Sequence, residues 1–158
     1  MDIFDTIRED HETILALVDA IEDTALTRDP TSADGARLEH LRDQLIALVE
    51  AHTAAEETLF YPLLQDDDDG RPLMVMALEQ HHVVSLLLQE VRTMAVRDEH
   101  FVPKCAILAE NLEDHIDEEE EDIFPLIGDL ISAEQADTLG QQFRKRVSDE
   151  MADHRKAA

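Results

Sequence analysis

Two copies of one phrase, a histidine followed four residues later by a glutamate, carry the clearest chemical signal in this chain. The first pair is His52 and Glu56, and the second is His115 and Glu119. In both copies a proline follows ten residues after the histidine, within an apolar run. Residues four apart share one helix face, and an imidazole or a carboxylate buried without a partner costs several kcal/mol. The repeated spacing therefore predicts that a metal ion holds these side chains.

Two further histidines occupy matching places in the two halves of the chain. His11 and His81 are each followed by apolar residues at the same offsets, three, six, seven and ten positions later. His82 competes with His81 for the second place, but the offsets favour His81. Each half is then a helix with one histidine followed by a helix with a His-x-x-x-Glu pair. A pseudo-twofold arrangement of the halves would bring four histidines and two glutamates together.

Hydrophobic periodicity predicts the elements that must position these side chains. The predicted helices cover residues 2–24, 36–64, 73–96 and 103–127, and a last helix opens at 132. Between the first two, residues 28–35 have the composition of a turn. Gly128 is expected to close the fourth helix, and Ser132 to Gln135 resembles a capping box that opens the last one.

Short connections between long helices favour antiparallel neighbours. We therefore predict an all-α fold, an up-down-up-down four-helix bundle over residues 1–130. Residues 131–158 form an additional C-terminal helix that is packed on the bundle or extends from it. Its partner is expected to be the bundle, another protein or a second copy of the chain.

The chain of 158 residues has a net charge of −25, with 38 acidic against 13 basic residues. Such a field would repel nucleic acid and anionic membrane surfaces, so we expect neither as a partner. Five of the 13 basic residues lie in the C-terminal helix. We expect them to contact the acidic fourth helix, with docking of a protein partner as the alternative.

No segment approaches the run of about 18 apolar residues that a membrane span requires. The first residues lack the basic and apolar regions of a signal peptide. The single cysteine, Cys105, excludes an internal disulfide and is expected to be a buried structural thiol. These features together predict a cytoplasmic location.

Imidazole and carboxylate ligands suit iron, manganese or zinc, and the absence of thiolates argues against a structural zinc site. Two bridging carboxylates with two histidines per metal would form a dinuclear centre with open positions. Such a centre could bind dioxygen or a reduced oxygen species. Four nearby acidic residues are interpreted instead as a solvated face: Glu57, Glu118, Glu120 and Glu121.

The spaced residues resemble the hemerythrin-like (HHE cation-binding) family over residues of about 5–128, and both Pro-containing tails agree. The resemblance implies two non-haem iron ions with an oxo or hydroxo bridge, for which manganese or zinc are substitutes. It makes Glu56 and Glu119 the bridges. It also implies binding of dioxygen, peroxide or nitric oxide, in oxygen or redox sensing, stress response or iron handling. The alternatives are a di-iron peroxidase or catalase-like enzyme and a metal-free helical interaction module.

One departure from the oxygen-carrying hemerythrins bears on function. The carriers have a second histidine four residues after the third-helix ligand, where this chain has Ser85; four residues before His81 it has Ala77. We expect Ser85 to share the inward face with His81, so that its place is a vacancy that disfavours reversible oxygen carriage. A carboxylate, a water or Tyr61 could fill it.

The position of the last carboxylate also differs between the resemblance and the internal repeat. The carriers place it five residues after the fourth-helix histidine, which would be Glu120 here. The repeat places it four residues after, at Glu119, and this assignment is favoured because the first half has the same spacing.

Overall fold

The computed structural model describes residues 1–26 and 32–157, and every regular element within these ranges is helical. This confirms the predicted all-α class. The elements are α1 (Ile3–Leu26), α2 (Ser32–Ala55), η1 (Glu56–Phe60), η2 (Tyr61–Leu64), α3 (Gly70–Thr93), α4 (Phe101–Glu118), η3 (Glu119–Ile123), α5 (Phe124–Leu130) and α6 (Ala133–Ala157).

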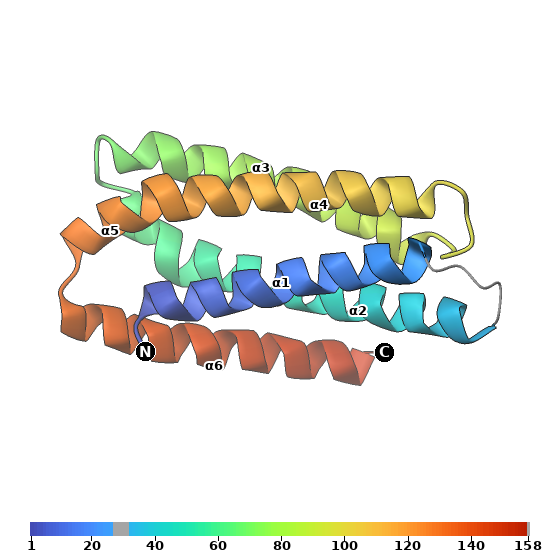
Figure 1. The fold of residues 1–158 in the computed structure, drawn as a ribbon. Helices are drawn as coiled ribbons and strands as arrows, with labels where there is room; N and C mark the ends of the chain where they lie inside the picture. Colours follow the sequence, from blue (N-terminus) through green and yellow to red (C-terminus); the bar gives the residue numbers. More distant parts are fainter. Residues whose placement is uncertain (27–31, 158) are drawn as a thin grey trace.

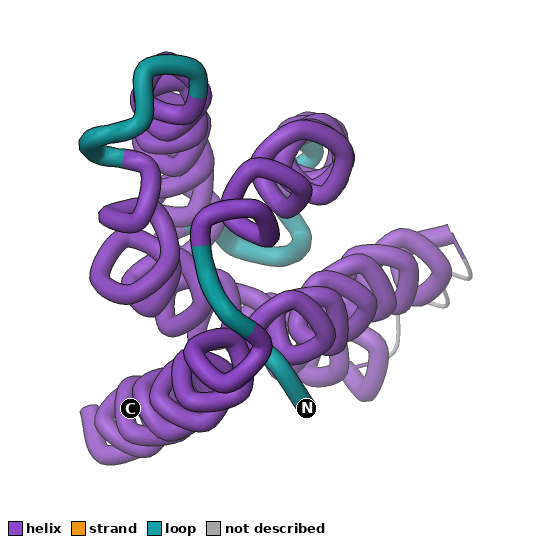
Figure 2. Tube along the Cα trace, turned by 90° about the vertical axis from the view of Figure 1, so that its left-hand side faces the viewer, coloured by secondary structure: helices purple, strands orange, loops and turns teal. Residues whose placement is uncertain are grey.

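The four helices α1 to α4 form a closed ring of neighbours, in which each one packs against the next and α4 returns to α1. Figure 1 shows the long helices running side by side with connections at the two ends, as an up-down-up-down bundle requires. The end-on view in Figure 2 shows loops only as short links between the helices of the described residues. The buried stripe of every bundle helix therefore faces a common core.

Some boundaries differ from the sequence prediction. The expected turn at 28–35 falls partly on residues 27–31, which lie outside the described residues, but Ser32–Gly35 already belong to α2. Gly128 does not end a helix: it lies inside α5, and the chain becomes extended at Ile131 (ψ 150°). The capping box is confirmed, because Ser132 and Gln135 exchange side-chain to backbone hydrogen bonds of 2.8 and 3.2 Å.

Two wide turns interrupt the helices that carry the His-x-x-x-Glu pairs. The N–H of Tyr61 donates to the carbonyl of Glu56, and the N–H of Phe124 donates to the carbonyl of Glu119, a π-helical pattern in both cases. A proline follows each of these donors. Proline has no N–H and its ring clashes with the carbonyl four residues earlier, which explains why the helix opens here. The sequence pattern had suggested unbroken helices.

The C-terminal helix packs on the bundle against α1 and α2. Phe143 is fully buried there, with its ring 5.5 Å from the ring of His52. Gly140 allows the close approach, because a Cβ atom at this position would lie 2.7 Å from the backbone of Asp2. The expected contact with the acidic fourth helix is wrong: Arg144 donates to the Thr6 hydroxyl of α1 (3.0 Å). The residues of α6 that are buried against the bundle, among them Phe143 and Val147, are apolar.

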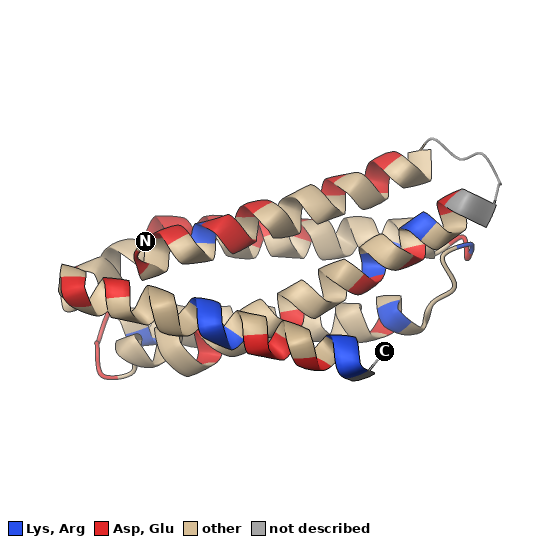
Figure 3. Cartoon of the chain, turned by 90° about the horizontal axis from the view of Figure 1, so that it is seen from below, with Lys and Arg blue, Asp and Glu red and all other residues tan. Residues whose placement is uncertain are grey.

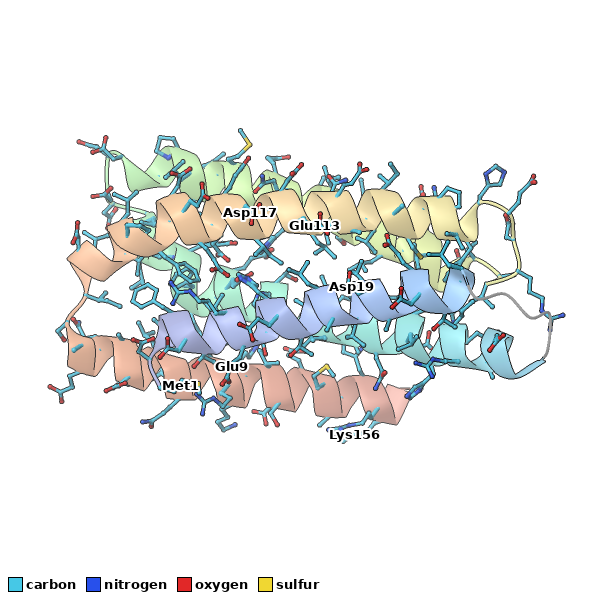
Figure 4. The ribbon with its side chains drawn as sticks, in the orientation of Figure 1. Met1, Glu9, Asp19, Glu113, Asp117 and Lys156 are labelled. Carbon is cyan, nitrogen blue, oxygen red and sulfur yellow. The ribbon has the colours of Figure 1, made fainter. Side chains whose placement is uncertain are left out.

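Acidic residues recur along all the helices in view in Figure 3, whereas Lys and Arg are few. Neighbouring helices α1 and α4 both expose acids, among them Glu9, Asp19, Glu113 and Asp117, which are labelled in Figure 4. Within the described ranges, the helices are too polar or too short to cross a membrane.

Candidate metal centre

Six polar side chains from four helices converge in the middle of the apolar core. They are His11 of α1, His52 of α2, Glu56 at the start of η1, His81 of α3, His115 of α4 and Glu119 at the start of η3. Each of them is at most 4% exposed, and both glutamates are fully buried. The structure thus brings together all six residues that the sequence singled out. His82, the competitor of His81, is exposed.

The two oxygens of Glu56 face different histidines. Its Oε1 lies 2.9 Å from His52 Nε2 and 3.8 Å from His11 Nε2. Its Oε2 lies 3.3 Å from His81 Nε2, which in turn is 3.1 Å from His115 Nε2. Two groups therefore have the spacing of metal ligands, one with His11 and His52 and the other with His81 and His115, and Glu56 belongs to both.

Glu119 is the second carboxylate of the centre, and its Oε2 lies 3.3 Å from His11 Nε2. Among the described residues, six inward atoms contact one another but make no well-directed hydrogen bond: both oxygens of each glutamate and the Nε2 atoms of His11 and His52. Buried polar atoms are almost always paired, and leaving them unpaired is costly. Bound cations would satisfy all of them at once, so the donor set fits a metal centre.

The outward nitrogen of every histidine has a partner of its own. His11 Nδ1 lies 2.7 Å from Glu120, and His81 Nδ1 lies 2.9 Å from Glu57. His52 Nδ1 lies 3.2 Å from Asp10, and His115 Nδ1 lies 2.9 Å from the side-chain oxygen of Gln80. An acceptor at Nδ1 keeps the proton there and leaves the Nε2 lone pair directed into the centre, as metal-ligating histidines require.

These outer partners are the functional residues that sequence reasoning missed. Glu57 and Glu120 were assigned to a solvated face, and Glu57 is indeed exposed and Glu120 partly so. Each of them, however, also follows a central glutamate and reaches a histidine of the other half. Asp10 and Gln80 directly precede the histidines of α1 and α3. Part of the signal was present in the repeat, since a second glutamate follows the central glutamate in both halves, but neither the periodicity nor the composition singled it out.

The four histidines are not electrostatically equal. Burial lowers the pKa of His11, but the carboxylates of Glu119 and Glu56 outweigh it and raise this pKa to about 10. The pKa of His81 is raised to about 9, because Glu56 and Glu57 outweigh burial in the same way. For His115 burial prevails, and the other histidines add to it, so that its pKa falls to about 3.

The two central carboxylates also differ in pKa. Burial and the charge of Glu56 raise the pKa of Glu119 to about 7. Burial disfavours the charged form of Glu56 too, but His52, His11 and His81 outweigh it and hold the pKa of Glu56 well below its usual range. A cluster that keeps carboxylates charged in an apolar core requires positive charge beside them, which protons or metal ions can supply.

Tyr61 and Phe124 occupy the same place in the two repeats but serve different surroundings. The Tyr61 hydroxyl is buried, 3.1 Å from His81 Nε2 and 3.4 Å from His115 Nε2. Phe124 instead stacks on His11, with ring centroids 6.4 Å apart. Only the second half of the centre therefore has a phenol within reach of its inward nitrogens.

The sequence analysis expected an open ligand position at Ser85, but the structure does not place Ser85 beside the centre. Ser85 is exposed, whereas Ala77, one turn before His81, is buried at 2% exposure. The inward stripe of α3 runs through Ala77, His81, Val84 and Leu88, and at about 3.6 residues per turn Ser85 falls on the other side of His81. The expectation that Ser85 shares the inward face is therefore wrong.

A small cavity of about 20 Å³ lies between α3 and α4 at the Ala77 position. It reaches from exposed Met76 to buried His115 and Glu119, with Gln80 also in its wall. A space of this size holds about one water-sized molecule. The second half of the centre therefore has room for a ligand that is not part of the protein.

The comparisons with known proteins agree with this architecture. The family profile described as "Hemerythrin HHE cation binding domain" matches residues 2–127. A solved structure, the hemerythrin HHE cation-binding domain-containing Rv2633c homolog from Mycobacterium kansasii, has a similar fold, with a TM-score of 0.81 and 21% identity over 97% of this chain and 89% of that one.

Two curated relatives are considerably longer than this chain. An uncharacterised hemerythrin-like protein of Schizosaccharomyces pombe is 24% identical over 106 residues, 66% of this chain and 52% of that protein. A DNA nickase of a Nostoc species is 24% identical over 151 residues, 94% of this chain and 40% of the nickase. The chain thus spans about half or less of these relatives.

Proposed function

The chain belongs to the hemerythrin HHE cation-binding domain family, and from this premise we propose that it holds two non-haem iron ions and binds dioxygen, peroxide or nitric oxide. The observation that carries the proposal is the position of Glu56, which belongs to both histidine groups and has one oxygen 2.9 Å from His52 and the other 3.3 Å from His81. A carboxylate in this position can bridge two ions. The proposed roles are oxygen or redox sensing, stress response or iron handling.

His11 and His52 would hold one ion, His81 and His115 would hold the other, and Glu56 would serve both. Glu119 is the proposed second bridge, with its nearest histidine at 3.3 Å. When bound, such a pair of ions supplies redox equivalents and open positions for small oxygen or nitrogen species. The chain contributes the dry surroundings: the aromatic rings of Phe60 and Tyr61 are fully buried beside the centre.

The cavity at Ala77 supports the choice of ligand class. Its volume of about 20 Å³, close to that of one water molecule, suits a small oxygen or nitrogen species rather than an organic substrate. Its wall includes His115 and Glu119, so a ligand in it would contact the second half of the centre.

A second candidate, a peroxidase or catalase-like activity, is favoured by Tyr61. Its hydroxyl lies within 3.4 Å of two inward nitrogens, and burial with the charges of Glu56 and Glu119 raises its pKa well above the usual value, so it keeps its proton in the metal-free protein. A protonated phenol beside a ligand cavity can donate a proton to a reduced oxygen species. The same hydroxyl could instead occupy a ligand position on the second ion.

The activity of the Nostoc nickase is a property of that relative, and we do not assign it to this chain. A net charge of −25 and acidic residues on neighbouring helices would repel the phosphate backbone of DNA. We therefore do not extend the nickase activity to this chain.

The test is metal analysis with an absorption spectrum of aerobically purified protein. The proposal expects about two irons per chain and the spectrum of a bridged diferric centre. Peroxide turnover then separates the candidates: rapid turnover that falls in Tyr61→Phe at unchanged iron content supports the enzyme, and reversible ligand binding without turnover supports the sensor. A colourless protein without bound iron after supply of ferrous iron would contradict both.

A further inference from the structure

The outer hydrogen bonds of the centre differ between its halves at one position. The residue that precedes the α1 histidine is Asp10, whose carboxylate pairs with His52 at 3.2 Å. The corresponding residue before the α3 histidine is Gln80, whose amide oxygen pairs with His115 at 2.9 Å. Since Glu120 and Glu57 serve the remaining two histidines, three rings have a carboxylate partner and one has an amide.

The orientation of the Gln80 amide is fixed by its other partner. Its nitrogen lies 2.7 Å from a carboxylate oxygen of Glu118. A carboxylate only accepts, so the amide nitrogen must face Glu118 and the amide oxygen must face His115. The negative charge of Glu118 is therefore separated from His115 by the Gln80 amide, whereas the Asp10 carboxylate contacts His52 directly. The first half has Ala55 where the second has Glu118, so it has no such relay.

We infer that Gln80 makes the two ion sites unequal: the ion at His81 and His115 is held more weakly than the ion at His11 and His52. A carboxylate at Nδ1 makes an imidazole a stronger donor and adds its own attraction for the cation, whereas an amide orients the ring with less charge. This inference rests on the proposed two-ion centre. It assigns Gln80 a positioning role that acts through His115.

The inequality has a spatial consequence. Gln80 and His115 both line the cavity at Ala77, whereas His11 and His52 do not. The less strongly held ion is then the one beside the open space. With less electron donation from its ligands it attracts an incoming anion more strongly, so external ligands bind on this side.

The experiment moves one negative charge from position 118 to position 80, where it contacts His115 directly. In the double variant Gln80→Glu/Glu118→Gln the acid and the amide exchange places, so the net charge and the chain of hydrogen bonds stay the same. Glu118→Gln alone is the matched control, because it removes the outer charge and leaves an amide on His115. Metal-free protein is titrated with zinc, which has no redox chemistry, and the two binding steps are measured by competition with a chelator.

The wild type should bind two zinc ions in two steps, with the weaker step lost in His115→Ala and the tighter step lost in His52→Ala. The double variant should strengthen the weaker step about 10- to 100-fold, the range for second-sphere changes at metal sites. The control should not. Asp10→Asn should weaken the tighter step, which a general loss of folding would not do selectively.

Two equal steps in the wild type, or an unchanged gap in the double variant, would overturn the inference while leaving the two-ion centre standing. One zinc per chain, retained in His115→Ala and lost in His52→Ala, would support the inequality and contradict the two-ion proposal. Binding of no zinc would contradict both.

Discussion

The two halves of the centre come from one repeated phrase but differ in what surrounds it. In the first half a carboxylate supports His52, and the Phe124 ring stacks on His11. In the second an amide supports His115, a buried phenol approaches the inward nitrogens, and a cavity opens beside them. Both halves have the same residue types at the equivalent positions of the centre, but the residues around these positions differ. The two halves are unequal because of the residues beside the repeated histidines and glutamates, and not because of those side chains themselves.

Loss of Glu56 should have the largest effect, because it removes the group common to both halves. Glu56→Ala should reduce the metal content from about two ions per chain to near zero, since this carboxylate faces histidines of both sets. Inductively coupled plasma mass spectrometry measures the content. Exposed Glu113→Ala on α4 is the control and should keep both ions. Two tightly bound ions in Glu56→Ala would refute the bridging role.

Removal of the metal should destabilise the bundle, because six polar groups then face each other in the core. Each ion at a free concentration a hundredfold above its Kd adds about 2.7 kcal/mol, and each kcal/mol shifts the Tm of a chain this size by about 2–4 °C. The Tm in calorimetry should therefore fall by about 10 °C or more. Equal melting of the loaded and metal-free forms would show that the ligands do not bind in the core.

Two substitutions on α3 should distinguish the cavity at Ala77 from the exposed face of the helix at Ser85. Ala77→His places a ring in the cavity beside His115 and should slow azide binding or peroxide reaction about tenfold, the effect of a barrier of about 1.4 kcal/mol. Ser85→His, on the exposed face, should leave the rate unchanged. Stopped-flow absorption at equal iron content measures both. A slower reaction in Ser85→His alone would restore the vacancy that the sequence suggested.

Metal binding should release protons near neutral pH. The pKa values of His11 and His81, raised to about 10 and about 9, lie above pH 7.5, so both rings are protonated in the metal-free protein. An ion displaces these protons, so that metal affinity rises with pH up to these values and falls on acidification. Calorimetry in buffers of different ionisation enthalpy should detect two protons or more, because the pKa of His52 is raised as well. No release would place the rings in the neutral form.

The smallest expected effect concerns the side chains that contact the outward nitrogens of the histidines. Glu57→Gln weakens the support of His81 and should lower the affinity of one ion about tenfold or more without changing the stoichiometry. Glu121→Gln alters the neighbour of Glu120 on an exposed position and should change neither. A competition titration with a chelator measures the difference. Equal affinities in the two variants would show that Glu57 does not support His81 in metal binding.

The sequence alone was sufficient to predict the class of fold and the six side chains that converge in the core. Helix periodicity is local, so an apolar stripe interrupted by histidine and glutamate at a spacing of four indicates both the helix and the inward position of the pair. The internal repeat then selected His81 over His82 and Glu119 over Glu120 as inward residues, and the structure places these four side chains accordingly. The capping box at Ser132 was equally local, and it is present.

Contacts between helices could only be decided by the tertiary structure. Ser85 and Ala77 are both one turn from His81, and which of them faces the centre depends on how α3 is rotated against α4. The partners of the outward nitrogens come from other helices, so their identity depends on the packing of the bundle and on the π turns before the prolines. A repeat in the sequence determines which residues are equivalent. Their neighbours, which make equivalent ligands behave differently, are determined when the helices pack.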